Sequence, residues 1–213
     1  MRVRFIGDVH GKWGRYRKLI KGQTHTLQVG DFGVGFRNLQ GDLLHGPPHD
    51  AMAKGNNQFI RGNHDSPKDC RNHPFWVRDG GYAFDGEGDI FCIGGAESID
   101  KDRRTWGLDW WPDEELAYGE LCNILDLYEE AKPRIVVTHD CPNTLIMHLY
   151  TKGIIPFFPN AVGQRTRTMF DNMLEIHKPE IWVNGHWHIE WEEELRGVRH
   201  IGLGELTHID LEI

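Results

Sequence analysis

Apolar residues in the first quarter of the chain form short runs separated by a stretch of helical periodicity. Residues 2–6 and 26–29 are apolar or alternating runs, and the apolar positions within 12–21 recur at the spacing of a helix. A third apolar run follows at 58–60. Strand, helix and strand in this order are typical of a parallel sheet, so the pattern predicts an α/β protein.

The rest of the chain continues this alternation of strands and helices. Pro112 and the acidic residues after it open a predicted helix over 112–130, and Pro179 stops another over 163–177. Residues 33–57 and 66–79 have the composition of loops, with one short helix expected in the first. The remaining predicted elements are a hairpin at 81–96, strands at 134–138 and 180–184, and antiparallel strands from 189 to 213. No repeat or linker interrupts the pattern, and we expect a single domain over 1–213.

Five of the predicted strands share one feature: each ends in Asp, His or Asn, which are types of residue that bind metal ions. These residues are Asp8 and His10, Asp31, Asn63, His64 and Asp65, His139, and His186 and His188. In α/β sheets, ligands bind in the crevice beyond the carboxyl ends of the strands. Side chains two residues apart in extended backbone point the same way. Asp8 and His10 are therefore able to reach one site together, and so are His186 and His188. Core packing does not explain this recurrence, and a shared site does.

The side chains at these strand ends combine oxygen donors with imidazole. None of the four cysteines lies in a C-x-x-C pair, which argues against a thiolate zinc site. Oxygen and imidazole together suit manganese first, with iron, zinc, nickel or cobalt as alternatives, and suit magnesium less well. There are enough ligands for two divalent ions, and paired ions clamp the attacking and leaving oxygens of a phosphoryl displacement.

Charge and hydropathy narrow the range of partners. The net charge of −8 argues against a long nucleic acid but not against a small phosphorylated or nucleotide substrate, because loaded metal ions make a site locally positive. No apolar run approaches the roughly 18 residues of a membrane span. The polar motif that begins at Gly7 leaves no room for a signal-peptide core, so we expect a cytoplasmic protein without membrane contact. The sequence leaves the oligomeric state open.

Taken together, these motifs resemble those of the calcineurin-like metallophosphoesterase superfamily. The matching stretches are Gly7-Asp-Val-His-Gly11, Gly30-Asp31, Gly62-Asn-His-Asp65, Thr138-His139-Asp140 and Gly185-His-Trp-His188. They occur in the order of the family and extend from residue 7 to residue 188. The resemblance implies a sandwich of two mixed β-sheets flanked by α-helices.

The resemblance also implies a role for each motif residue. Asp8, His10 and His188 would bind one metal ion, and Asn63, His139 and His186 the other. Asp31 would bridge the two ions, and a hydroxide between them would be the nucleophile. His64 would protonate the leaving oxygen, and Asp65 would orient His64.

Two departures bear on the substrate. The protein Ser/Thr phosphatases of the superfamily have Asp-Arg-Gly shortly after the second motif and Glu after Asn-His. This chain continues Asp31-Phe-Gly-Val-Gly and has Asp65 instead. It therefore resembles the phosphodiesterase and nucleotide-hydrolase branches more closely. A phosphomonoesterase and a non-catalytic scaffold that keeps its metal ions are the alternatives.

Several residues near the motifs are candidates for substrate contact. Arg37 and Arg61 stand beside motifs and are expected to bind phosphate oxygens, although Arg61 is equally suited to a structural ion pair. The pairs Arg103-Arg104 and Arg165/Arg167 are weaker candidates, because most arginines are solvated. The cluster of Trp106, Trp110 and Trp111 is suited either to stacking a nucleobase or to packing a helix onto the sheet.

Overall fold

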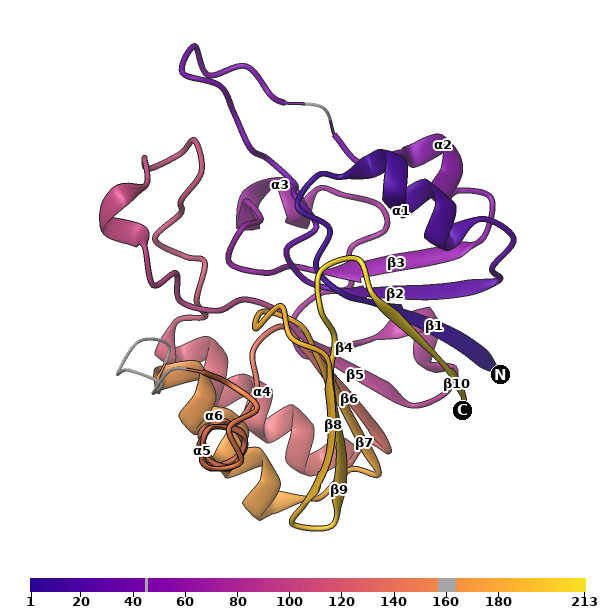
Figure 1. The fold of residues 1–213 in the computed structure, drawn as a ribbon, viewed down its shortest axis with the longest axis vertical. Coiled ribbons are helices and arrows are strands. Elements are labelled where there is room, and N and C mark those ends of the chain that lie inside the picture. The colour runs from indigo at the N-terminus through magenta and orange to yellow at the C-terminus, as the bar shows by residue number, and fades with distance from the viewer. Residues whose placement is uncertain (45, 157–163) are drawn as a thin grey trace.

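The computed structural model describes residues 1–44, 46–156 and 164–213, and two mixed β-sheets pack face to face within it (Figure 1). The first sheet has the order β10-β1-β2-β3 and contains β1 (Arg2–Ile6), β2 (His25–Val29), β3 (Asn56–Ile60) and β10 (His208–Glu212). The second has the order β4-β5-β6-β7-β9-β8 and contains β4 (Gly81–Tyr82), β5 (Ile90–Ile93), β6 (Ile135–Thr138), β7 (Ile181–Asn184), β8 (Trp191–Leu195) and β9 (Val198–Gly202). The expected sandwich of two mixed sheets is confirmed.

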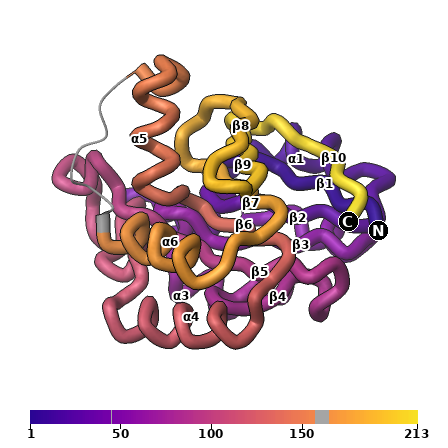
Figure 2. The backbone as a smooth tube through the Cα atoms, turned by 90° about the horizontal axis from the view of Figure 1, so that it is seen from below, coloured from indigo at the N-terminus to yellow at the C-terminus, as the bar shows by residue number. Residues whose placement is uncertain are grey.

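Helices cover the outer faces of both sheets. Those beside the first sheet are α1 (Trp13–Ile20), α2 (His49–Met52) and α3 (Pro67–Arg71). Those beside the second are α4 (Tyr118–Ala131), α5 (Asn143–Thr151) and α6 (Gln164–Ile176), which Figure 2 shows along its outer side. Short 3-10 turns occupy Ala83–Gly86 and Lys101–Arg103. Among the residues described, no helix is long and apolar enough to cross a membrane.

The period-two pattern of the strands determines which side chains fill the space between the sheets. Val3 and Phe5 of β1 are fully buried there against the second sheet, and Val137 and Val183 belong to the same cluster. Arg4, between the two apolar residues, points the other way and bonds Asp210 of β10 at 2.7 Å. Separate apolar clusters lie beneath the helices on the outer faces. Burial on both faces explains why the central strands are nearly continuous apolar runs.

Helix boundaries are where the sequence-based expectation differs from the structure. The helix expected from Pro112 begins six residues later, at Tyr118, because Glu114 and Glu115 bind distant residues instead of occupying a first turn. The expected loop at 66–79 contains α3, which Ser66 caps through the amide of Asp69. Helix α5 was not expected at all. The helix expected at 163–177 corresponds to α6, although residue 163 lies outside the described residues.

The carboxyl ends of the parallel strands meet between the two sheets. Strands β1, β2 and β3 are parallel to one another, and so are β5, β6, β7 and β9. The chain crosses from β9 in the second sheet to β10 in the first at the same place. During this crossing the backbone amide of Leu206 donates to the carbonyl of Asp8 at 2.9 Å. The backbone amide of Gly7 donates to the carbonyl of Thr207 at 3.0 Å. A Cβ at Gly7 would lie 2.0 Å from the carbonyl oxygen of Gly204, so the contact requires glycine.

His200 on β9 makes stability depend on pH. Its side chain is fully buried, and burial lowers its pKa to about 4 against a smaller, raising effect of the Leu195 backbone. The unfolded chain takes up this proton near pH 6.5. The stabilisation that depends on a neutral His200 is therefore complete above that pH, and this part of the free energy of unfolding is lost as the pH falls toward 4. We expect His200→Leu to reduce the loss of unfolding free energy between pH 7 and 4.5 by about 2 kcal/mol.

Chemical denaturation at a series of pH values measures this effect. His208→Leu is the matched control, since His208 is exposed on β10. Parallel pH profiles for the parent protein and His200→Leu would contradict the prediction.

Candidate metal centre and active site

The loops that carry the predicted ligands have a backbone conformation that residues other than glycine rarely adopt. Positive φ angles between 47° and 68° occur at four of these residues, namely His10, Asp31, His186 and His188. Such conformations cost free energy and collect at functional sites. The loops also approach one another closely: a Cβ at Gly30 would lie 2.2 Å from the ring of His139, and one at Gly62 would lie 2.1 Å from the Asp31 carboxylate. The two glycines therefore let the ligands converge.

One group of side chains gathers around Asp8 and Asp31. Their carboxylates, with His10 and His188, offer ligand atoms that all lie within 4.8 Å of one another. The His188 Nε2 atom is 2.9 Å from the Asp8 carboxylate and 3.0 Å from the His10 Nε2 atom. Two imidazole nitrogens and two buried carboxylates directed at one point form a donor set that fits a divalent cation.

A second group shares Asp31. The ring nitrogen Nε2 of His139 lies 3.3 Å from Asp31 and 3.1 Å from the Asn63 Oδ1 atom. The rings of His139 and His186 are 4.9 Å apart, and ligand atoms of Asp31, His139 and His186 again lie within 4.8 Å of one another. Asp31 is only 2% exposed and belongs to both groups. The arrangement fits two cations that share one carboxylate.

The electrostatics of the centre also favour cation binding. Burial lowers the pKa of His139, but the Asp31 carboxylate outweighs burial and raises it to about 10. Burial opposes ionisation of Asp31, yet the neighbouring histidines hold its pKa well below the usual range. His139 and Asp31 thus form a buried pair in which each group favours the charged form of the other. Because metal ligands must be deprotonated, cation binding by this pair would be coupled to proton release.

A pocket of about 410 Å³ opens over these two groups. Its floor contains ligand candidates of both groups, and His64 stands beside His10 with the ring centroids 5.0 Å apart. Ile99, Arg104, Arg167 and Trp187 contribute to its walls. A site of this size is suited to a small ligand whose polar part lies over the metal centre.

Comparison with known proteins agrees with this geometry. The model of the calcineurin-like phosphoesterase family matches residues 1–190. The chain belongs to this family. It is therefore a hydrolase that acts on phosphoric ester bonds. None of the curated proteins matches it by sequence.

Solved structures resemble this phosphoesterase at low sequence identity. A protein of Staphylococcus aureus described as a 5′-nucleotidase is 13% identical with a TM-score of 0.54, and the match covers 100% of this chain and 51% of that one. The phosphoesterase thus spans about half of that protein, and the likeness is one of fold. Phosphopantetheinyl hydrolase from Mycobacterium tuberculosis is 14% identical with a TM-score of 0.49, over 95% of this chain and 89% of that one.

A buried hydrogen-bond chain orients Asn63 in the phosphoesterase. The Asn63 side-chain amide donates to the Ser98 hydroxyl at 2.9 Å, and this hydroxyl donates to Glu114 at 2.7 Å. The Ser98 backbone amide also donates to Glu114, at 2.7 Å. With its nitrogen engaged in this way, Asn63 presents its oxygen to the centre. The ring of His139 is fixed similarly, because its Nδ1 lies 2.9 Å from the carbonyl of Val29 and leaves Nε2 facing Asp31.

We expect Ser98→Ala to weaken metal binding by about 10- to 100-fold, since partners that orient metal ligands have effects of this size. Metal titration against a competing chelator measures the affinity. Thr26→Val is the matched control, because the buried Thr26 hydroxyl donates to Asn57 at 2.8 Å in the first sheet, outside the two ligand groups. Equal affinities in Ser98→Ala and the parent protein would show that Ser98 does not orient Asn63.

A second buried network holds the loop that carries His186 and His188. The Asp140 carboxylate accepts hydrogen bonds from the Trp187 indole at 3.0 Å, from the amide of Cys141 at 2.8 Å and from Nε of Arg167 at 2.6 Å. The Arg167 guanidinium carbon lies 5.2 Å from the centroid of the Trp187 ring. Both ligand histidines flank Trp187, so this network supports their positions.

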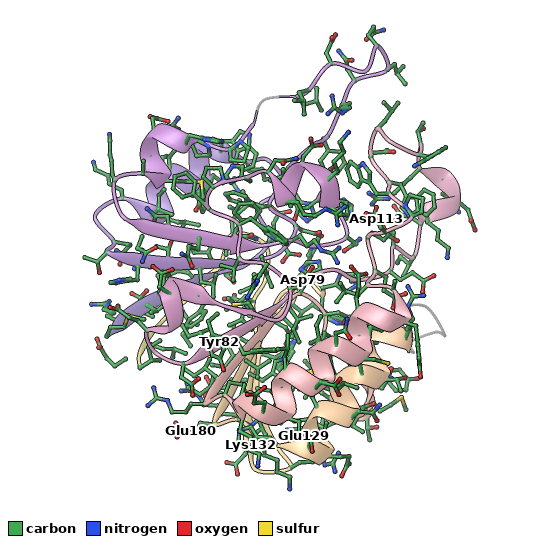
Figure 3. All side chains as sticks on the ribbon, turned by 180° about the vertical axis from the view of Figure 1, so that it is seen from behind. Asp79, Tyr82, Asp113, Glu129, Lys132 and Glu180 are labelled. Atoms are coloured by element: carbon green, nitrogen blue, oxygen red, sulfur yellow. The ribbon has the colours of Figure 1, made fainter. Side chains whose placement is uncertain are left out.

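The structure places Arg61 and Arg37 away from the pocket walls. Arg61 is 3% exposed, pairs with Asp79 at 2.9 Å and donates to the carbonyls of Asp113 and Glu114. Figure 3 shows Asp79 and Asp113 toward the N-terminal end of α4. Arg37 contacts Asp69 at 3.6 Å and the carbonyl of Gly41. Arg61 thus has the partners of the structural alternative, and neither arginine is among the residues that line the pocket.

Asp65 also differs from its expected role. Its buried carboxylate accepts hydrogen bonds from the backbone amides of Phe32, Gly33, Val34 and Gly62, at 2.6 to 2.9 Å. It therefore fixes the loop that follows β2, and Arg104 is the charged side chain beside the ring nitrogens of His64. The terminal nitrogens of Arg104 lie 3.0 and 2.8 Å from the two ring nitrogens of His64.

The tryptophan cluster does not form a wall of the pocket. Trp111 is buried against Phe36, with ring centroids 5.7 Å apart, whereas Trp106 is 75% exposed. Trp111 is thus packed inside the protein, but against the segment that follows β2 and not between a helix and the sheet. The tryptophan that lines the pocket is Trp187, which the sequence indicated only as the residue between two ligand histidines.

Proposed function

We propose that this phosphoesterase hydrolyses phosphodiester or nucleotide substrates at a centre of two divalent metal ions, with manganese as the ion to test first. The observation that carries the proposal is the position of Asp31 in both ligand groups. Asp8, His10 and His188 would complete one site, and Asn63, His139 and His186 the other. When bound, the ions would supply Lewis acidity toward the phosphoryl oxygens and would lower the pKa of water.

His64 would supply the proton that the leaving group needs. Its backbone amide bonds Asp31 at 2.7 Å, which ties the residue to the metal centre. Burial lowers the pKa of His64, Asp31 opposes this, and Arg104 adds to the lowering. An anionic substrate would act in the same direction as Asp31 and favour the protonated ring. His64 would then donate its proton to the departing ester oxygen as a general acid.

Arg104 supports both the ring and the substrate in this proposal. Its Nε atom is anchored to Asp100 at 2.7 Å, and its Nη1 atom donates to the carbonyl of Asp109. The guanidinium therefore stays beside His64, where it would attract a phosphoryl oxygen. The apolar part of the wall, Ile99 and Trp187, leaves room for a small esterified group. These features favour a small phosphodiester over a phosphorylated protein segment.

Hydrolysis of bis(p-nitrophenyl) phosphate and of p-nitrophenyl phosphate by manganese-loaded protein tests the proposal. We expect a higher kcat/KM for the diester and loss of activity with EDTA. Metal analysis of the same sample should give two ions per chain. A preference for the monoester would replace the diesterase proposal with a phosphomonoesterase, and two bound ions without turnover of either compound would favour a binding scaffold.

A further inference from the structure

The guanidinium of Arg167 has unused hydrogen-bonding capacity inside the pocket. Its side chain is 3% exposed, and its Nε atom is anchored to Asp140, itself fully buried. Within the part of the chain that the structure describes, its two terminal nitrogens donate no hydrogen bond. A buried arginine that keeps its terminal donors free is unusual, because unsatisfied buried polar groups are costly.

Arg167 is also held in one orientation before any ligand arrives. Asp140 fixes one edge of the guanidinium, and the Trp187 ring lies 5.2 Å from its centre. The nearby acid Glu115 is already engaged by the amide and hydroxyl of Thr166 and by Arg165. Arg167 lines the pocket together with the ligand candidate His186. A preorganised guanidinium of this kind loses little entropy when it binds an oxyanion.

The two arginines that line the pocket, Arg104 and Arg167, differ in the surroundings of their terminal nitrogens. The Arg104 Nη1 atom donates to the carbonyl of Asp109, and its terminal nitrogens lie beside the His64 ring, so Arg104 belongs with the reacting phosphate. Arg167 lies on α6, beside the loop of His186 and Trp187, and the described residues offer its terminal nitrogens no such partner. With Arg104 beside the reacting phosphate, the donors of Arg167 are available to a second group.

We propose that Arg167 forms a subsite for a second phosphoryl group, so that the substrate carries one phosphate beyond the ester that is cleaved. The proposal rests on the proposed function, because it assigns the class of substrate for the same site. The free edge of the guanidinium matches two oxygens of a phosphate. A phosphodiester with an additional terminal phosphate belongs to this class, and a nucleoside bisphosphate ester is an accessible example.

Two chromogenic diesters test the subsite. Thymidine 5′-(p-nitrophenyl phosphate) and its 3′-phosphorylated form release the same leaving group and differ only by the second phosphate. For the manganese-loaded parent we expect a kcat/KM about 10-fold or more higher for the phosphorylated form. Arg167→Met should bring the ratio of the two values close to one, and Arg167→Lys should give an intermediate ratio. Arg165→Met, which removes an arginine and an ion pair from the same helix, should leave the ratio unchanged.

The ratio of the kcat/KM values for the two diesters distinguishes a role of Arg167 in substrate binding from a purely structural role. If Arg167→Met slows both diesters equally, Arg167 only supports the loop of His186, and the proposal is overturned. A parent protein that hydrolyses both diesters at the same rate also overturns it while leaving the proposed function intact. If neither diester is hydrolysed, the proposed function fails, and calorimetric titration with thymidine 3′,5′-bisphosphate and thymidine 5′-monophosphate decides the subsite independently. Tighter binding of the bisphosphate that is lost in Arg167→Met would support the subsite, and equal binding would overturn it.

Discussion

Replacing Asp31 with asparagine is expected to lower the kcat/KM for diester hydrolysis by on the order of 10³-fold or more. Among the described residues, Asp31 is the one that belongs to both ligand groups, so its loss weakens both sites together. The variant would also remove the charge that raises the pKa of His139. Metal analysis after desalting should therefore show fewer than two ions per chain.

Asp50→Asn provides the matched control. Asp50 pairs with Arg17 on the surface at 2.7 Å and lies outside both ligand groups, so activity and metal content should stay at the level of the parent protein. Thermal unfolding of both variants would show whether the fold is retained. An Asp31→Asn protein that holds two ions and keeps activity within about tenfold would refute the shared-ligand assignment.

His64→Asn is expected to slow hydrolysis by an amount that depends on the leaving group. General acids contribute about 10²- to 10⁴-fold when the departing oxygen needs a proton. An alkyl phosphodiester has such a leaving group, whereas p-nitrophenolate departs as a stable anion. We therefore expect a loss in kcat of about 10²-fold or more for the alkyl ester and a much smaller loss for the nitrophenyl ester.

The comparison of the two esters within one variant makes this measurement independent of folding yield. His208→Asn, at an exposed position on β10, serves as the control and should behave like the parent protein. An equal loss on both esters would mean that His64 acts on the phosphoryl charge or on the metal centre, and not as a proton donor.

The strands, and the convergence of the candidate metal ligands on one place, were predictable from the sequence for a common physical reason. Apolar runs such as 135–138 must be buried, and a polar residue that ends such a run must lie at the carboxyl end of a strand. Parallel strands bring these ends together whatever the details of the connections. Asp8, Asp31, His139 and His186 therefore converge although they are up to 178 residues apart.

Residues outside this pattern were harder to place because their partners are distant in the sequence. Arg104 meets His64 across 40 residues, and Arg167 meets Asp140 across 27, and no local periodicity reports such pairs. Glu114 looked like part of a helical first turn but binds Ser98. Arg61 stands next to a motif, yet its long side chain turns away to Asp79. Position beside a motif does not fix the direction of a flexible side chain.

The crossing from β9 to β10 ties the metal centre to the cooperativity of the fold. Strand β10 pairs with β1 over five residues, and the segment before it bonds the Gly7-Asp8 turn through Leu206 and Thr207. Opening β10 would uncover the edge of β1 and at the same time release the turn that carries Asp8. Loosening of this C-terminal strand and disassembly of the first ligand group are thus one event, and a cation bound by Asp8 would resist local opening at a strand that it does not touch.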